Sequence, residues 1–142
     1  MASRIAHFNI RARDPEASIG FYRKLGLEPV GFLNLSETMY LIYLGTPEEP
    51  DVTLELTVNE APPAGYDWSA GSGHIALGVG DMDAALARLA EAGFQPEGPP
   101  FHPGERAELR VCFVRDPDGV RVELADGEFR TPGDELPERF RN

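Results

Sequence analysis

The chain has 142 residues, of which 42% are hydrophobic and 26% charged, a composition typical of a globular protein rather than a disordered one. Its formal net charge of -11 has the wrong sign for neutralising the phosphates of a nucleic acid. No apolar run approaches the roughly 18 residues of a membrane span, and charged residues near the start argue against a signal peptide. With a single cysteine, Cys112, no internal disulfide is possible, and we expect a cytoplasmic protein.

The first half of the sequence predicts the element order β-α-β-β-β. Residues 5–11 alternate in polarity, as expected for a strand with one apolar face. Asp14-Pro15 is a helix start, with Asp as the N-cap and Pro at the first helical position, and Gly26 is a helix end. A core-facing stripe is expected where apolar residues recur every four positions, at Ala17, Phe21 and Leu25. Three strands are then expected, around Val30–Leu35, Met39–Leu44 and 51–59.

The second half repeats this order after a connector, residues 60–73, that is rich in Pro, Gly and Ser. Asp81 is the expected N-cap of its helix, and Asp116-Pro117-Asp118-Gly119 is an expected turn. Its strands are expected at 74–80, weakly within 94–106, at 109–114 and at 120–125. The predicted fold class is therefore α+β, with two tandem βαβββ modules (1–59 and 74–125), the connector, and a C-terminal tail (126–142) to which no structure is assigned.

An internal repeat relates the two halves. HFNIRARDPEASIGFYRKLG corresponds to HIALGVGDMDAALARLAEAG, and DVTLELT corresponds to GVRVELA. Each half opens with a histidine and closes on an aliphatic–Glu–Leu step. His7 and Glu55 are 48 positions apart, and His74 and Glu123 are 49 positions apart. Matching residue types at matching spacing indicate that the four side chains share a purpose.

Two imidazoles and two carboxylates form a mixed nitrogen and oxygen donor set, which suits zinc, nickel, cobalt, iron or manganese. The two carboxylate charges balance a divalent ion, whereas without an ion they repel each other. The ordinary alternative is that these residues occupy the wet face of an antiparallel sheet, where polar side chains need no further purpose. That alternative does not explain why residue type and spacing recur.

The chain resembles the vicinal-oxygen-chelate superfamily, and within it the short bacterial glyoxalase I (lactoylglutathione lyase) type. The resemblance covers about residues 5–125 and rests on H-F-N-I-R at 7–11, L-E-L-T-V-N at 54–59, G-H-I-A-L at 73–77 and D-P-D-G-V-R-V-E-L at 116–124. Glu55 stands where acyl-CoA epimerases of the superfamily tend to carry Gln. Ring-cleaving dioxygenases of the same superfamily use two His and one Glu.

The resemblance implies an isomerising lyase that converts a thiol–methylglyoxal hemithioacetal to a hydroxyacyl thioester by proton transfer through an enediolate, a methylglyoxal detoxification. It implies one divalent metal per site, nickel or zinc before cobalt, manganese or iron, with His7, Glu55, His74 and Glu123 as ligands. By the same analogy Glu123 is the catalytic base and Glu55 has the complementary catalytic role, whereas the histidines are plain ligands.

The resemblance also implies a thiol site and a homodimer. Arg11 and Asn59 match positions that hold the thiol, although each could equally be a surface polar residue. The loop 99–108 lacks the glycine-rich, lysine-bearing stretch of the family, so the thiol is left open between glutathione and another low-molecular-weight thiol. In the family arrangement His7 and Glu55 of one subunit meet His74 and Glu123 of the other. The connector is long enough to permit this exchange and does not require it.

Three other functions remain open on the sequence. One is another metalloenzyme of the superfamily, such as an epimerase or an enzyme that modifies a different small molecule. Another is a non-catalytic protein that binds an antibiotic or metabolite, a class that typically lacks the four ligands. The last is a dimer in which the metal is structural. We expect the partner to be a small-molecule substrate rather than a nucleic acid or a membrane.

Overall fold

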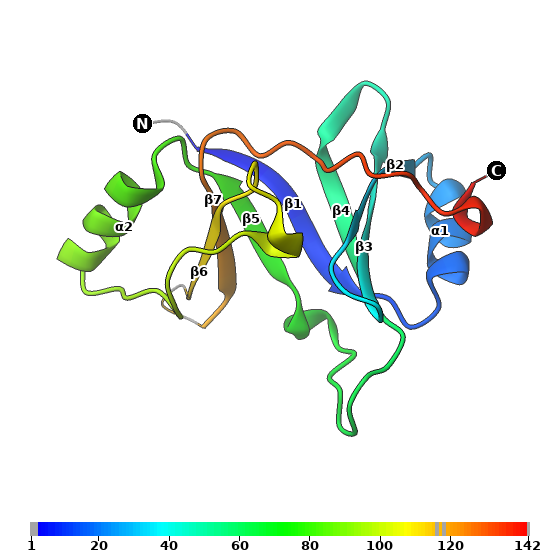
Figure 1. Ribbon diagram of the computed structural model, residues 1–142, viewed down its shortest axis with the longest axis horizontal. Helices are drawn as coiled ribbons and strands as arrows, with labels where there is room; N and C mark the ends of the chain where they lie inside the picture. The colour runs from blue at the N-terminus through cyan, green and yellow to red at the C-terminus, as the bar shows by residue number, and fades with distance from the viewer. Residues whose placement is uncertain (1–2, 116, 118, 142) are drawn as a thin grey trace. The chain divides into compact units, whose positions relative to one another are not determined.

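The structure, a computed structural model, describes residues 3–115, 117 and 119–141, and it divides into two compact units (Figure 1). The first, called here the His7 unit, holds His7–Gly73 and the tail from Thr131. The second, the His74 unit, holds His74–Arg130 and the N-terminal residues as far as Ala6. Within the described ranges, every helix is too short or too polar to cross a bilayer.

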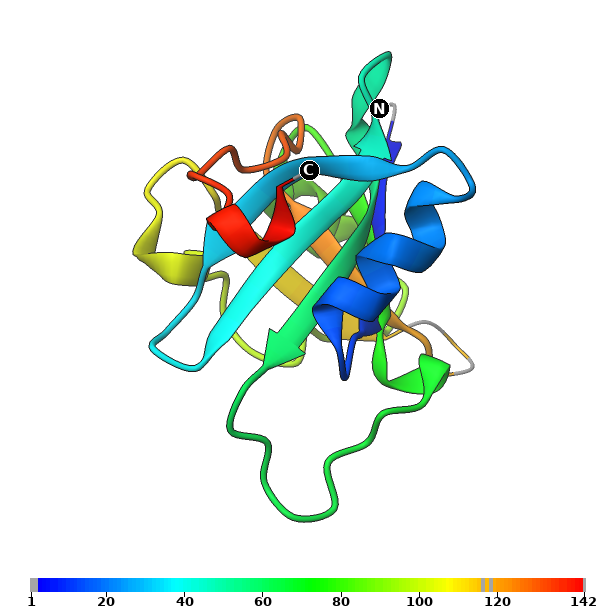
Figure 2. The same ribbon diagram turned by 90° about the vertical axis from the view of Figure 1, so that its right-hand side faces the viewer.

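The His7 unit has the expected β-α-β-β-β order. Its elements are β1 (Arg4–Arg11, the part from His7 on), α1 (Pro15–Arg23), β2 (Glu28–Asn34), β3 (Met39–Thr46) and β4 (Glu49–Asn59). β4 pairs in parallel with β1 and antiparallel with β3, and β3 pairs antiparallel with β2. The sheet therefore runs β2-β3-β4-β1, with α1 against one of its faces (Figure 2).

Helix α1 starts as the sequence predicts but buries a different side. The Asp14 side chain accepts a hydrogen bond from Ala17 N at 3.1 Å, and Pro15 is in the first turn. The expected stripe is wrong, because Phe21 is 60% exposed and the core is reached instead by Ile19. Phe21 is two positions from Ile19, which is about 200° around an α-helix, so one helix cannot bury both against one sheet.

The C-terminal tail completes the core of the His7 unit. Gly133 forms a bridge with Phe32, and the tail then makes a short 3-10 turn, Glu138–Phe140, which Figure 2 shows in red. The side chain of Phe140, at the end of this turn, is buried. Arg139 donates from Nη2 to the Tyr40 hydroxyl at 2.8 Å. The tail, to which the sequence pattern assigned no structure, is thus a packed part of this unit.

The His74 unit holds β5 (His74–Gly78), α2 (Met82–Glu91), β6 (Val111–Arg115) and β7 (Arg121–Ala125). β7 pairs in parallel with β5 and antiparallel with β6, which gives the order β5-β7-β6. Asp81 caps α2 as predicted, accepting from Ala84 N at 3.0 Å. The weak strand expected within 94–106 is reduced to a single bridge between Phe101 and Val111, followed by a 3-10 turn at Pro103–Glu105.

The last strands of this unit contain the single cysteine and the expected turn. Cys112 is fully buried in the core of the His74 unit, packed with residues such as Met82 and Leu124, and burial raises the pKa of its thiol. The turn predicted at 116–119 falls partly outside the described residues, since Asp116 and Asp118 are among those not described.

Candidate metal centre

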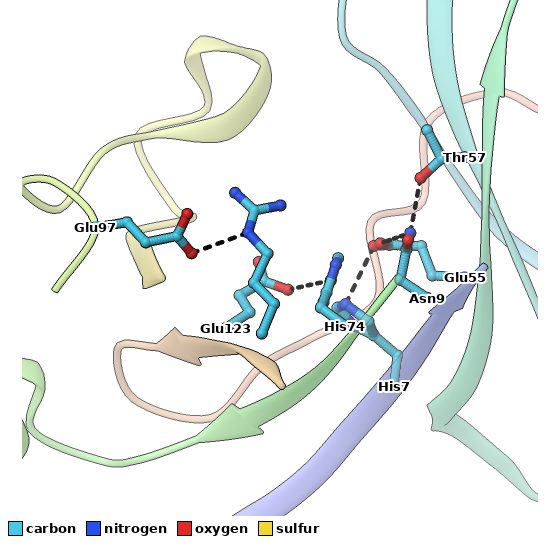
Figure 3. Close-up of polar contacts among 8 residues, drawn as sticks. His7, Asn9, Glu55, Thr57, His74, Glu97 and Glu123 are labelled. Atoms are coloured by element: carbon cyan, nitrogen blue, oxygen red, sulfur yellow. Dashed lines mark hydrogen bonds and ion pairs between the residues drawn. The ribbon is translucent and has the colours of Figure 1, made fainter. Parts of the chain in front are cut away.

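In the His7 unit, the parallel pairing of β1 with β4 brings one imidazole to one carboxylate. Asn9 stands opposite Glu55 in the register, and His7 lies on the same face as Asn9 because side chains on a strand alternate. His7 Nε2 and Glu55 Oε2 are 3.4 Å apart (Figure 3). The two residues are 0% and 3% exposed, so this polar pair is held away from water.

The His74 unit contains the equivalent pair. β5 runs parallel to β7, Ala76 stands opposite Glu123, and His74 lies on the face of Ala76. His74 Nε2 and Glu123 Oε2 are 3.1 Å apart (Figure 3). Glu123 is buried and His74 is partly buried. Each unit therefore presents one His–Glu pair at the same place in its parallel strand pair.

The separation within each pair fits two ligands of one ion. Ligand atoms that each lie roughly 2.0–2.2 Å from an ion are about 3 Å apart at a right angle and about 3.4 Å apart at a tetrahedral angle. The nitrogen–oxygen distances of 3.4 Å and 3.1 Å match that range. Each pair could therefore supply two adjacent ligands to a divalent transition-metal ion.

An aromatic ring accompanies each pair. Tyr43 on β3 stands opposite Glu55, and its ring meets that of His7 edge to face, with centroids 5.9 Å apart. Phe113 on β6 stands opposite Glu123, and its ring meets that of His74 edge to face at 5.2 Å. The internal repeat thus extends from the four expected ligands to the side chains that hold the imidazole rings in place.

Two residues that sequence reasoning did not single out accompany the first pair: Asn9 contacts Glu55, and Thr57 contacts Asn9. Asn9 donates from Nδ2 to Glu55 Oε1 at 2.8 Å and to Thr57 Oγ1 at 2.7 Å (Figure 3). The signal for both was the two-residue period of a strand, which puts Asn9 on the face of His7 and Thr57 on the face of Glu55. In the His74 unit, Arg121 lies over the Phe113 ring at 3.7 Å and donates from Nε to Glu97 Oε2 at 3.0 Å.

The residues expected to hold a thiol lie at the connector end of the His7 unit. Arg11 donates from Nη1 to the Asp67 carbonyl oxygen at 2.7 Å, and its guanidinium lies 4.1 Å from the centre of the Tyr66 ring. Asn59 accepts from Ala61 N at 3.0 Å. It also lines a pocket of about 410 Å³ in this unit, whose charged lining residues are Arg13, Glu16, Glu60 and Arg139.

In the loop 99–108, His102 and Arg106 have local partners. His102 Nδ1 hydrogen-bonds with the Leu109 carbonyl oxygen, and Arg106 donates from Nε to Glu108 Oε1 at 2.9 Å. His102 has no counterpart in the repeat and stays apart from the two His–Glu pairs in sequence.

Two units that each carry a His–Glu pair on a parallel strand pair have the duplicated arrangement of the vicinal-oxygen-chelate fold. The model of the Glyoxalase/Bleomycin resistance protein/Dioxygenase superfamily matches residues 4–124, and the chain belongs to this family. The resemblance expected from the sequence motifs is thereby confirmed.

The chain is similar in sequence to one named enzyme and in fold to several solved structures. The chain is 32% identical over 130 residues to a lactoylglutathione lyase of Salmonella typhimurium, covering 88% of this chain and 93% of that protein. Its fold is similar to that of a hypothetical protein from Bacillus halodurans, with a TM-score of 0.71 at 18% identity, covering 94% of this chain and all of that one. It is also similar to a variant of Streptomyces coelicolor methylmalonyl-CoA epimerase in complex with 2-nitronate-propionyl-CoA, with a TM-score of 0.64 at 25% identity, covering 90% and 96% of the two chains.

Proposed function

We propose that the protein is a metal-dependent lyase of the glyoxalase I type, which converts the hemithioacetal of methylglyoxal and a small thiol to a hydroxyacyl thioester. The observation that carries the proposal is the recurrence of a buried His–Glu pair at the same register position in both units. The name of the Salmonella relative, at 32% identity over most of both chains, supports this particular chemistry.

The proposed ligands are His7, Glu55, His74 and Glu123. Each unit type contributes one His–Glu pair to a centre. The donor types suit nickel or zinc, and also cobalt, manganese or iron. A bound divalent ion supplies Lewis-acid stabilisation of the negative charge that develops on adjacent substrate oxygens. Two carboxylates and two neutral imidazoles leave a centre with no net charge once the ion is present.

The protein side chains move the proton. The carbon bonded to sulfur loses a proton to Glu123, which returns it to the neighbouring carbonyl carbon, while the hydroxyl proton passes to the other oxygen. The product is an isomer of the substrate, so no oxidant or water is consumed. A positioned carboxylate contributes about 10²–10⁴-fold to such a step. His7 and His74 act as ligands, since a metal-bound imidazole nitrogen cannot also exchange a proton.

Arg11 and Asn59 are the proposed contacts for the thiol. The pocket lined by Asn59 contains the two guanidinium groups of Arg13 and Arg139 as well as two carboxylates. A zwitterionic thiol with carboxylates and an ammonium group, such as glutathione, matches that mixture of charges. The loop 99–108 lacks the family's lysine, which keeps another low-molecular-weight thiol in the proposal.

A second candidate is epimerisation of an acyl-CoA thioester, which the likeness to the Streptomyces coelicolor epimerase favours. That reaction also removes a proton from a carbon next to a carbonyl group. The two candidates share a base and a metal, and they differ in the substrate that the protein binds.

The two candidates are separated by one set of assays on the metal-free protein reloaded in turn with nickel, zinc, cobalt, manganese and iron. Each form is given methylglyoxal with glutathione or another small thiol, and thioester formation is followed by absorbance. In parallel, each form is incubated with methylmalonyl-CoA in deuterium oxide, and deuterium incorporation is measured by mass spectrometry. Thioester formation supports the lyase. Deuterium uptake without thioester formation would favour the epimerase over the lyase. A protein that binds none of the five metals would contradict both candidates.

We further propose a cytoplasmic homodimer in which His7 and Glu55 of one chain act with His74 and Glu123 of the other. Closed twofold dimers are the commonest soluble assemblies, and the family resemblance implies an exchange of modules. A monomer at micromolar concentration that binds its metal fully would contradict the shared centre.

A further inference from the structure

We propose that Arg121 binds a carboxylate of the thiol, so that the substrate of the proposed lyase is the hemithioacetal of a carboxylate-bearing thiol rather than of a neutral one. The inference rests on the proposed function, because it names the substrate class of the same site. Arg121 contacts a part of the substrate that does not react, and it is therefore a specificity-determining residue.

Arg121 stands on the same face of the His74 unit as the two proposed ligands of that unit. It precedes Glu123 by two residues on β7, and side chains two apart on a strand share a face. In the parallel pairing of β5 with β7, Ile75 stands opposite Val122, and His74 and Arg121 each come one residue earlier. The Arg121 side chain is 37% exposed, so it is accessible to a small molecule beside the His–Glu pair.

Two contacts hold the Arg121 guanidinium in place. Its Cζ atom lies 3.7 Å from the centre of the Phe113 ring, and that ring packs edge to face on His74 with centroids 5.2 Å apart. Its Nε donates to Glu97 Oε2 at 3.0 Å. A cation over an aromatic face is attracted by the ring, and a side chain that is already ordered loses less entropy when a ligand binds. The guanidinium is therefore preorganised next to the proposed centre.

These contacts leave the outer edge of the guanidinium open. Glu97 occupies Nε, whereas Nη1 and Nη2 of Arg121 have no hydrogen-bond acceptor among the residues that the structure describes. The two terminal nitrogens form an edge that can hold both oxygens of a carboxylate in parallel hydrogen bonds. A carboxylate is thus the partner that this edge fits.

The charges around Arg121 also favour an anion. Arg115 Nη2 lies 3.8 Å from Glu97 Oε1, and Arg115 Nη1 donates to the Gly119 carbonyl oxygen at 3.0 Å. Two arginines therefore share one glutamate, which leaves one positive charge in excess in a chain whose net charge is -11. Since the proposed centre is neutral once its ion is bound, this excess attracts an anionic substrate locally.

The excess positive charge distinguishes Arg121 from the pocket of the His7 unit. The charged groups that line that pocket are two guanidinium groups and two carboxylates, a balance that suits a zwitterionic group. The surroundings of Arg121 suit a carboxylate with no ammonium group beside it. The glycine carboxylate of glutathione is of this kind, whereas a neutral thiol has no group for the open edge.

The inference is tested on the Zn²⁺-loaded protein with two unreactive ligands, S-methylglutathione and its glycine monoethyl ester, which lacks that carboxylate. Calorimetry measures the affinity of the wild type and of Arg121→Met, which keeps an unbranched side chain over Phe113 without the charge. Arg115→Met is the matched control, because it removes an arginine from the same glutamate and leaves the Arg121 guanidinium. Glu97→Gln keeps an acceptor for Nε and removes the competing negative charge.

We expect the wild type to bind S-methylglutathione about 10–100-fold more tightly than the ester, because the ester cannot form the charge-assisted pair. Arg121→Met should abolish this preference by weakening only the binding of S-methylglutathione. Arg115→Met should retain the preference within about threefold, since an exposed charge is screened. Glu97→Gln should increase it by about 2–5-fold, because one negative charge near the ligand is gone.

Turnover gives a second readout. With the hemithioacetal of glutathione, Arg121→Met should raise KM by about 10–100-fold and leave kcat near the wild-type value, as loss of binding to an unreacting group does. With the hemithioacetal of the ester, wild type and Arg121→Met should have the same KM. A role limited to folding would not depend on the carboxylate of the substrate.

Equal affinity of the wild type for the two ligands, including no binding of either, would overturn the inference and leave the proposed lyase standing. So would a wild-type preference in Arg121→Met. A preference that depends on Arg121 in a protein that forms no thioester would instead overturn the lyase and retain the carboxylate site. If Arg121→Met does not fold, the wild-type preference and its increase in Glu97→Gln decide the question, and absence of both overturns the inference.

Discussion

Gly73 lies so close to Asn9 that a Cβ atom added at Gly73 would stand 1.7 Å from the Asn9 carbonyl oxygen. The opposing atom belongs to the backbone, so no side-chain rotation could relieve the overlap. Gly73 directly precedes His74, the first residue of β5. The contact therefore determines the path of the chain immediately before one of the proposed ligands.

Replacing Gly73 with Ala is expected to lower the free energy of unfolding by about 1–3 kcal/mol, because inserting a carbon into a packed contact forces the backbone to shift. Metal affinity should fall with it, since the shift begins next to His74. Gly20→Ala is the control, as a Cβ at Gly20 meets nothing within 4 Å. Because Gly20 is within a helix, its replacement with Ala should raise the free energy of unfolding by about 0.5–1 kcal/mol. Urea unfolding measures both, and equal stabilities for the two variants would contradict the prediction.

Changing Glu123 to Gln is expected to reduce thioester formation by about 10²–10⁴-fold, because the amide cannot accept the substrate proton. The far-ultraviolet circular dichroism and the unfolding midpoint should stay near those of the wild type, since Gln has the size of Glu. Glu55→Gln is the matched variant in the other unit. Glu55 is a proposed ligand, so Glu55→Gln should weaken metal binding. Wild-type turnover by Glu123→Gln would exclude Glu123 as the base.

Mixing two inactive variants tests whether the centre is shared between subunits. A dimer of one Glu55→Gln chain and one Glu123→Gln chain would, in a shared arrangement, contain one centre with both changes and one with neither. Random mixing should then restore about a quarter of the wild-type sites, because half of the dimers are mixed and each mixed dimer has one intact site of two. Activity that stays at the level of the separate variants would place each centre within one chain.

Much of the fold could be predicted because its signals are local. The caps at Asp14 and Asp81 and the alternation along β1 and β4 depend on residues close together in the chain, which the sequence displays directly. The repeat of His and Glu is visible because the two halves carry the same residue types at nearly the same spacing. The family resemblance rests on the same repeat and is confirmed by the family match over residues 4–124. The buried side of α1 could not be predicted from such local signals. Phe21 and Ile19 are both apolar, and only packing against the sheet selects Ile19 as the buried residue.

Other features depend on partners that are distant in sequence. Phe140 contributes to the core of the His7 unit through contacts with β3, about a hundred residues earlier, and nothing in the charged segment around it indicates that packing. Asn9 is visible on the polar face of its strand, yet its hydrogen bond to Glu55 depends on β4 lying beside β1 in one particular register. The pattern predicts which face a side chain occupies, whereas its hydrogen-bond partner is determined by the pairing of strands.

Acid is expected to weaken the His74 unit through Asp126. Its Oδ1 accepts from Met82 N at 3.0 Å, and its Oδ2 lies 3.0 Å from Arg110 Nη1. The backbone hydrogen bond from Met82 and then the contact with Arg110 hold the pKa of this carboxyl below its usual value. A lowered folded-state pKa means stability that is present above the unfolded value near 4 and is lost as the pH falls through the folded value.

Asp126→Asn should therefore reduce the difference in unfolding free energy between pH 7 and acid, as measured by urea titration at a series of pH values. Arg110→Met removes the ion pair and keeps the hydrogen bond from Met82, so it should retain the larger share of the pH dependence. A wild-type pH profile in the Asp126→Asn protein would show that this carboxyl does not contribute.

The buried end of the tail should be essential to the stability of the His7 unit. Phe140 is 1% exposed, its ring centre lies 5.9 Å from that of Tyr40, and its carbonyl oxygen accepts from Arg23 Nη2 at 3.1 Å. Phe140→Ala is expected to cost about 3–5 kcal/mol, because it removes buried apolar surface and leaves a cavity. Phe21→Ala removes the same number of atoms at a position that is 60% exposed, and it should cost less than about 1 kcal/mol. Urea unfolding of the two variants measures the contrast, and similar losses from both would mean that the tail does not pack into this core in solution.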